Sequence, residues 1–257
     1  MQSISNPGVL ITRPADQFDE VSTLIEQGPA RAIPFPLLDI VPIPQDSTAD
    51  GKVLNSDQYQ LAIFISRNAV RLGVPILMDS WHGLPQHILW LGVGRSTAAE
   101  MSRCDITGIF PELASSEGVL SMPETQGVTG KRVLIIRGEG GRELLAATLR
   151  QRGAQVDYLE VYRRKKHPWT PAQLMHLLTE ERVRAAVVTS GEALQYFSEL
   201  AGTASRDLTL LVPSARLMDL ARQLGFDRIR LTDGADSGAL ASGIAKWMTE
   251  QRHGQGQ

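Results

Sequence analysis

The sequence predicts an α/β fold with two similar doubly wound domains, each built on a parallel sheet of the flavodoxin or Rossmann type. The first observation is an internal repeat, because Val9–Arg13 (VLITR) matches Val133–Arg137 (VLIIR) at an offset of 124 residues. Leu61–Val70 matches Ala185–Leu194 at the same offset. The second observation is that apolar segments alternate with segments of helical periodicity, as expected for parallel strands covered by helices on both faces.

Each half of the repeat is expected to run strand, helix, strand, then strand, helix, strand, helix. In the first half, apolar residues at helical spacing over Ala15–Gln27 follow the first strand, and a β-prone segment covers Ala30–Ile43. A strand over Leu89–Gly94 precedes a further helix, and Ser116–Leu120 begins the last one. These elements account for one doubly wound set.

The second half repeats this order. A helix is expected over Glu143–Arg152 and a β-prone segment over Ala154–Tyr162. The strand within Leu208–Ser214 and the helix that begins near Ser237–Leu240 complete the set. Gly28, Gly153 and Gly225 stand where left-handed residues often end helices, so we expect C-caps there.

The bulk composition is that of an average globular protein, with 42% hydrophobic and 21% charged residues and a net charge of −2. Nucleic-acid binders usually carry a basic surplus, so nucleic acid is not an expected partner. No apolar run reaches the roughly 18 residues of a membrane span, and the N-terminus lacks the pattern of a signal peptide. We therefore expect a cytoplasmic protein without a membrane partner.

Metal and cofactor motifs are missing from the sequence. Cys104 is the only cysteine, and the five histidines lack ligand spacing, so no metal site is predicted. The run Gly138–Glu143 (GEGGRE) begins like a dinucleotide fingerprint but has glutamate in place of the third glycine, and no P-loop is present. No nucleophile elbow or Ser/His/Asp set occurs. We expect no cofactor and no nucleophilic catalysis.

The candidate site lies where the strands run into their helices, because ligands of doubly wound sheets bind beyond the carboxyl ends of the strands. The residues there are rich in serine, threonine, arginine and glycine, which suits a polyanion. They are Arg13–Pro14, Ser66–Asn68, Gly94–Thr97, Arg137–Arg142, Ser190–Gly191 and Pro213–Ser214. The alternative is structural, since Ser66 and Ser190 are equally suited to cap the helices that follow them.

A family resemblance covers nearly the whole chain. The run Val133–Leu145 (VLIIRGEGGRELL), continued by Gly153–Ala154 and Glu160–Arg163 (EVYR), resembles the central signature of uroporphyrinogen-III synthases. Ser66, Ser190, Thr97 after Gly94, and the ending Ala235–Ile244 are also similar to that family. Val212–Ala215 departs from its usual Gly-Pro and Thr-Ala pattern.

The resemblance implies a discontinuous domain order. Residues 1–35 with 165–257 would form the first α/β domain, and residues 36–164 the second. Pro36–Ile43 and Tyr158–Arg164 would form a two-stranded linker, with a cleft between the domains.

The resemblance also implies a reaction. The family converts linear hydroxymethylbilane, a polycarboxylate tetrapyrrole, into uroporphyrinogen III with inversion of ring D and loss of water, in haem biosynthesis and without a cofactor. Tyr162 would be the proton donor, because a phenol is protonated at neutral pH; the alternative is a tyrosine that only packs. The residues predicted to bind this substrate, chosen from their places after the strands, are Arg13, Ser66, Gly94, Thr97, Arg137, Gly138, Arg142, Ser190 and Ser214.

The sequence also permits two other functions. A non-catalytic, two-domain module that binds an anionic small molecule would also lack a conventional catalytic set. If the protein were a nucleotide-dependent enzyme, NAD or ATP would raise its thermal unfolding temperature. We expect no such shift. We expect a monomer.

Overall fold

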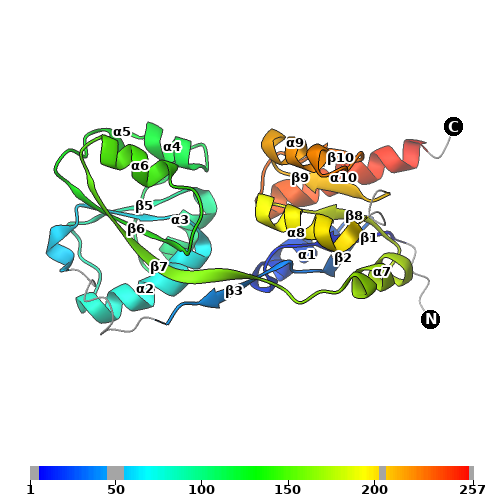
Figure 1. The fold of residues 1–257 in the computed structure, drawn as a ribbon, viewed down its shortest axis with the longest axis horizontal. Helices are drawn as coiled ribbons and strands as arrows, with labels where there is room; N and C mark the ends of the chain where they lie inside the picture. The colour runs from blue at the N-terminus through cyan, green and yellow to red at the C-terminus, as the bar shows by residue number, and fades with distance from the viewer. Residues whose placement is uncertain (1–5, 45–54, 203–206, 255–257) are drawn as a thin grey trace. The chain divides into compact units, whose positions relative to one another are not determined.

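The computed structural model describes residues 6–44, 55–202 and 207–254. The chain divides into two compact units: unit 1 comprises Met1–Asp39 with Lys165–Gln257, and unit 2 comprises Ile40–Arg164. Each is an α/β unit with its own sheet (Figure 1). The fold class predicted from the sequence is confirmed.

The sheet of unit 1 has five strands in the order β10-β9-β8-β1-β2. All four neighbouring pairs are parallel. The strands are β1 (Gly8–Ile11), β2 (Arg31–Pro34), β8 (Val183–Val187), β9 (Thr209–Val212) and β10 (Ile229–Leu231). Because β1 and β8 are central and largely buried along their length, they read in the sequence as apolar runs.

Helices cover both faces of this sheet. Val9 and Ile11 of β1 pack in the cluster formed with α1 and α10, whereas Leu10 packs in the cluster formed with α8 and α9. This alternation is that of a strand buried on both sides. The helices are α1 (Phe18–Glu26), preceded by the 3-10 turn η1 (Ala15–Gln17), α7 (Pro171–Glu180), α8 (Gly191–Ala201), α9 (Ala215–Gln223) and α10 (Ser237–Gly254).

The sheet of unit 2 has the order β3-β7-β6-β4-β5. The pairs β7-β6, β6-β4 and β4-β5 are parallel, and a parallel bridge joins Leu91 to Ile109 beyond β5. The strands are β3 (Leu38–Pro42), β4 (Leu61–Phe64), β5 (Leu89–Gly92), β6 (Arg132–Gly138) and β7 (Gln155–Lys166).

The helices of unit 2 also form two layers. α2 and α3 pack on one face of the sheet and α4 and α6 on the other, as the two separate core clusters show. The helices are α2 (Arg67–Trp81), α3 (Arg95–Arg103), α4 (Ser116–Ser121), α5 (Pro123–Gln126) and α6 (Leu144–Gln151), and the 3-10 turn η2 (Ser56–Gln58) precedes β4.

The chain leaves unit 1 through β3 and returns through β7, and these two strands form an antiparallel ladder. The N–H of Ile43 donates to the carbonyl of Val161 at 3.0 Å, and that of His167 donates to the carbonyl of Leu37 at 2.9 Å. Since the numbering rises on one strand as it falls on the other, the pairing is antiparallel. β7 is long because its first part also pairs with β6.

The internal repeat appears in the topology, but each sheet combines strands from both halves of the sequence. β1 and β6, which carry the matching VLITR and VLIIR runs, hold equivalent places, as do β8 and β4. The order β2-β1-β8-β9 of one sheet corresponds to β7-β6-β4-β5 of the other. The repeat therefore describes a duplicated fold.

One detail of the expected helix ends is wrong. Gly153 and Gly225 have positive φ, at 86° and 87°, as left-handed C-caps do. Gly28 is not among the glycines with positive φ. Its N–H closes a tight turn on the carbonyl of Ile25 at 2.9 Å, so α1 ends without a left-handed residue.

Among the described residues, no helix is both long and apolar enough to cross a membrane.

Candidate active site

The residues predicted for the site lie at the carboxyl ends of the strands in both units. In unit 2, Ser66 follows β4, Gly94 follows β5, and Gly138 ends β6. In unit 1, Arg13 follows β1 closely and Ser190 precedes α8.

Tyr162 of β7 and Ser66 meet directly in unit 2. The phenol oxygen of Tyr162 lies 3.0 Å from Oγ of Ser66, and either hydroxyl can donate. Ser66 is also the N-cap of α2, because its Oγ accepts the N–H of Ala69 at 3.0 Å. Tyr162 is 4% exposed, whereas Ser66 is half-buried. Ser66 therefore caps α2, as the structural alternative predicted, and also contacts Tyr162, the candidate proton donor.

A β-bulge turns Tyr162 toward Ser66. Arg137 of β6 pairs with Glu160 but Gly138 pairs with Tyr162, so β7 contains one extra residue, Val161. Regular alternation would place Tyr162 on the same face as Tyr158. Instead Tyr158 packs in the cluster formed with α6, and Val161 and Tyr162 both pack in the cluster formed with α2. The bulge therefore brings the phenol to the start of α2.

Gly138 packs against the ring of Tyr162. A Cβ at Gly138 would overlap Cε2 of that ring and would lie 2.6 Å from Cζ and 3.0 Å from Cδ2. The next N–H, that of Glu139, donates to the carbonyl of Tyr162 at 2.7 Å. One contiguous cluster at the carboxyl ends of the strands therefore contains Gly138, Glu139, Tyr162 and Ser66.

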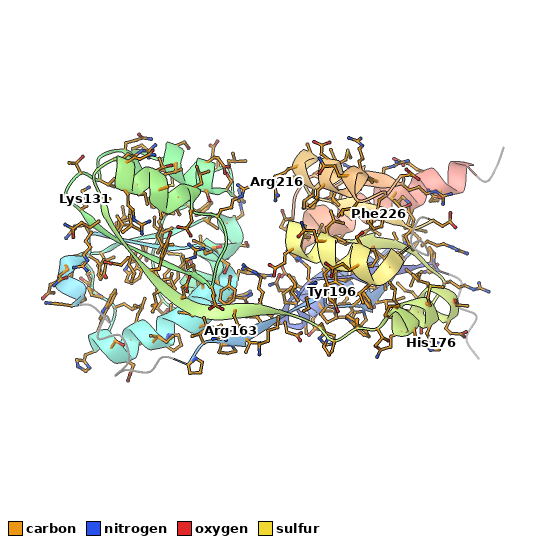
Figure 2. The ribbon with its side chains drawn as sticks, in the orientation of Figure 1. Lys131, Arg163, His176, Tyr196, Arg216 and Phe226 are labelled. Carbon is orange, nitrogen blue, oxygen red and sulfur yellow. The ribbon has the colours of Figure 1, made fainter. Side chains whose placement is uncertain are left out.

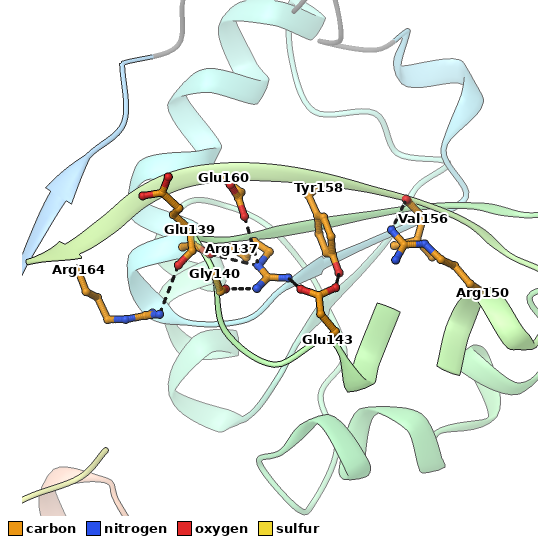
Figure 3. Close-up of polar contacts among 10 residues, drawn as sticks. Arg137, Glu139, Gly140, Glu143, Arg150, Val156, Tyr158, Glu160 and Arg164 are labelled. Carbon is orange, nitrogen blue, oxygen red and sulfur yellow. Dashed lines mark hydrogen bonds and ion pairs between the residues drawn. The ribbon is translucent and has the colours of Figure 1, made fainter. Parts of the chain in front are cut away.

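Arg137 is turned into its own loop (Figure 3). Its side chain is 4% exposed, and Nη1 donates to Oε1 of Glu143 at 3.0 Å. Nε donates to the carbonyl of Gly138 at 3.2 Å, and Nη2 donates to the carbonyl of Gly140. The guanidinium carbon lies 4.5 Å from the centre of the Tyr158 ring. These contacts tie together the glycine-rich loop that follows β6.

Glu143 and Tyr158 complete this network. The phenol of Tyr158 donates to Oε2 of Glu143 at 2.5 Å. The hydrogen bonds from Tyr158 and Arg137 lower the pKa of Glu143 below its ordinary value, so it is ionised at neutral pH. Burial and the hydrogen bond to Glu143 raise the pKa of Tyr158. Tyr158 was not predicted as a member of this network, because only its aromatic character marks it in the sequence.

Arg142 differs from Arg137 because it lies on the surface. Its Nη1 contacts Oε1 of Glu117 in α4 at 3.2 Å, and both side chains are 53% exposed. An exposed pair of this kind contributes little to stability and is open to competition from another anion.

Gly94 and Thr97 lie at the start of α3. Gly94 is the N-cap residue, and a Cβ there would lie 2.5 Å from Cβ of Ala114, so the segment before α4 covers it. Thr97 is 2% exposed and lies beside Gly92, where a Cβ would come within 3.3 Å of the threonine Cβ. The side chain of Thr97 is therefore part of the packing at this helix start.

In unit 1, Ser190 and Ser214 are also N-caps. Oγ of Ser190 accepts the N–H of Ala193 at 3.2 Å, and Oγ of Ser214 accepts that of Leu217 at 3.3 Å. A single serine before a helix is usually a cap, and both are half-buried here.

Arg13 reaches across to the start of α10. Nη2 donates to the carbonyl of Ala235 at 2.5 Å, and Nη1 lies 3.4 Å from Oγ of the buried Ser237. Its guanidinium therefore joins the end of β1 to the segment before the last helix.

Arg216 lies near the starts of α8 and α9 and was not predicted as a site residue. It is exposed, stands in the first turn of α9 (Figure 2), and its Nη1 would lie 3.8 Å from a Cβ at Gly191, the first residue of α8. It lies two residues beyond Pro213–Ser214, the segment that was selected as the turn from strand to helix.

The described residues contain no group of three or more histidines, cysteines or acids arranged to hold a metal ion. The cluster of Tyr162 and Ser66 in unit 2 can transfer protons between hydroxyl groups. The helix starts and arginines at the carboxyl ends of the strands can bind anions in each unit.

Known proteins resemble this chain along almost its whole length. A family model described as Uroporphyrinogen-III synthase HemD matches residues 19–242. The uroporphyrinogen-III synthase of Salmonella typhimurium is 34% identical over 241 residues, covering 90% of this chain and 97% of that protein. That of Escherichia coli is 33% identical over 244 residues, covering 90% and 97%.

Solved structures share the fold. A mutant uroporphyrinogen III synthase from Thermus thermophilus superposes with a TM-score of 0.62 at 17% identity, covering 95% of this chain and 99% of that one. The synthetase from Helicobacter pylori gives 0.61 at 16% identity, covering 94% and 99%. At 16–17% identity, these structures support the fold alone. The family model and the sequence relatives show that the chain belongs to the uroporphyrinogen-III synthase family.

Proposed function

We propose that this chain closes the linear tetrapyrrole hydroxymethylbilane to uroporphyrinogen III, with inversion of ring D and release of water, in haem biosynthesis. Family membership supports the reaction. The observation that carries the proposal is the cluster in which the Tyr162 phenol lies 3.0 Å from Ser66 at the carboxyl edge of the sheet. It offers a proton donor where ligands of such sheets bind.

The proton must travel through Ser66 in this proposal. Tyr162 is almost fully buried, whereas Ser66 is half-buried, so the serine hydroxyl is the more accessible member of the pair. As the carbon–oxygen bond of the hydroxymethyl group breaks, Ser66 gives its proton to the departing oxygen, which leaves as water. Tyr162 passes its proton to Ser66 in the same step, so that a phenolate forms and not a serine alkoxide, and the proton released on ring closure restores the phenol.

Binding of the substrate carboxylates is assigned to arginines and helix starts. Arg142 is an exposed cation in unit 2, and Arg13 and Arg216 supply cations in unit 1. Ser66, Gly94, Ser190 and Ser214 stand at helix N-termini, where the macrodipole and backbone N–H groups favour anions.

Control of conformation is the main task of such an enzyme, because free hydroxymethylbilane closes without inversion to the type I isomer. Holding the chain in the geometry for ring inversion can lower a barrier by several kcal/mol without a nucleophile.

The test is the identity of the product. The protein is incubated with hydroxymethylbilane generated enzymatically, and the type I and type III isomers are separated after oxidation to porphyrins. We expect mostly type III, whereas the heat-denatured protein gives mostly type I. Mostly type I from the native protein would reject the reaction and favour a binding module for an anionic ligand.

Replacing Arg142 by alanine is expected to raise KM for hydroxymethylbilane about threefold to tenfold, since one charge-assisted hydrogen bond to a carboxylate is lost. Turnover should change little, because Arg142 lies outside the Tyr162 cluster. Steady-state formation of the type III isomer measures both constants.

The matched control is Arg222→Ala, because Arg222 also forms an exposed ion pair, with Asp219 at 3.1 Å, and lies in the last turn of α9. It should leave KM unaltered. An Arg142→Ala variant with the same KM and turnover as the unsubstituted protein would make Arg142 an ordinary surface residue.

A further inference from the structure

We infer that Arg137, Glu143 and Tyr158 are positioning residues, which hold the loop after β6 against Tyr162 and so fix the proposed proton donor. The inference rests on the proposed function. It gives Arg137 a role through its own loop, in place of the substrate contact that its position after a strand predicts.

The guanidinium of Arg137 spans the loop from end to end. Its three nitrogens donate to Gly138, to Gly140 and to Glu143, with the Nε and Nη1 bonds at 3.2 Å and 3.0 Å. The side chain is 4% exposed, and its Nε also lies 3.8 Å from Oε1 of Glu160 in β7. A planar fork suits this arrangement, because its donors point in fixed directions.

Tyr158 and Glu143 hold the guanidinium from the other side. The ring of Tyr158 lies 4.5 Å from the guanidinium carbon of Arg137 and 5.4 Å from that of Arg150. Its hydroxyl donates to Glu143 at 2.5 Å, and Glu143 in turn accepts from Arg137 (Figure 3). Each member therefore contacts the other two, which restricts the loop more than any one contact would.

The loop transmits this restraint to Tyr162 through two contacts. The N–H of Glu139 donates to the Tyr162 carbonyl at 2.7 Å, and Gly138 packs on the Tyr162 ring. Because Tyr162 is the residue displaced by the β-bulge, its position depends on the strand pairing at Gly138. A loop that relaxes would let the phenol move away from Ser66.

A similar triad at the other end of the same two strands provides a control. Arg132 donates to Asp157 at 2.6 Å, Tyr59 donates to the same carboxylate at 3.1 Å, and the Arg132 guanidinium lies 5.6 Å from the Tyr59 ring. This triad has the same chemistry but stands at the amino end of β6, away from Tyr162.

The experiment compares Tyr158→Phe with Tyr59→Phe, because each removes one hydroxyl that donates to a carboxylate. Single-turnover formation of the type III isomer by Tyr158→Phe should be about fivefold to tenfold slower, with KM little changed. Tyr59→Phe should retain the turnover of the unsubstituted protein. Because Tyr59 is fully buried, loss of its hydroxyl should lower the thermal midpoint at least as much as Tyr158→Phe does.

A double-mutant cycle separates positioning from general stability. If Tyr158 acts through Tyr162, adding Tyr158→Phe to Tyr162→Phe should cause little further loss of rate. An unchanged rate for Tyr158→Phe, an equal loss in Tyr59→Phe, or a full additional loss in the Tyr162→Phe background would each overturn the inference. The unsubstituted protein, assayed for type III product in the same series, tests the proposed function independently.

Discussion

Replacing Tyr162 by phenylalanine is expected to lower the turnover number for uroporphyrinogen III about 100-fold, because a general acid in the transition state contributes at least this much. Phenylalanine keeps the ring that packs on Gly138 and removes only the hydroxyl that contacts Ser66. KM should change little, since the buried phenol is not assigned to carboxylate binding. Rapid-quench measurement of type III formation in a single turnover checks the chemical step directly.

Tyr196→Phe is the matched control for this variant. Tyr196 is also nearly buried, and its hydroxyl donates to the carbonyl of His167 at 2.5 Å within unit 1 (Figure 2). Its loss should cost about 1 kcal/mol of unfolding free energy and leave turnover unaltered. Single-turnover type III formation by Tyr162→Phe at the rate of the unsubstituted protein would make Tyr162 a tyrosine that only packs.

The fold was predictable because its strongest signals are local and occur twice. The VLITR and VLIIR runs, β1 and β6, are buried on both faces, so their apolar character survives in the sequence without a partner being known. The rules for connections between parallel strands joined by helices then leave few possible sheet topologies. The β3-β7 ladder was different, because antiparallel pairing between segments more than 100 residues apart has no local signal, and it came from the family resemblance.

The site was only partly predictable, because a residue's type does not determine what surrounds it. Arg137 and Arg142 stand in one loop and look alike in the sequence, yet the first is buried in contacts with its own loop and the second is 53% exposed. Tyr162 was chosen by resemblance, but its contact with Ser66 depends on the bulge at Val161, which strand alternation would not predict. Arg216 was missed for lack of any sequence signal beyond its position in a helix.

Replacing Gly138 by alanine is expected to impair both stability and catalysis, because the new methyl group would occupy space held by the Tyr162 ring. It would overlap Cε2 and lie 2.6 Å from Cζ, so either the ring or the strand must move. Overpacking of this kind typically costs about 1–3 kcal/mol of unfolding free energy. A displaced ring also separates the phenol from Ser66, so the loss of turnover should be at least as large as that of Tyr162→Phe. Chemical denaturation and single-turnover assays measure the two effects.

Two further variants separate this clash from a general effect of alanine. Gly127→Ala serves as the control, because a Cβ there meets no atom within 4 Å and Gly127 has a φ of −94°, so stability and turnover should persist. Tyr162→Leu lacks the distal ring carbons, so adding Gly138→Ala to it should cost much less stability than Gly138→Ala costs alone. If the cost were the same in both backgrounds, the Tyr162 ring would not be what requires glycine at this position, and the link between the loop and the proton donor would lose its steric basis.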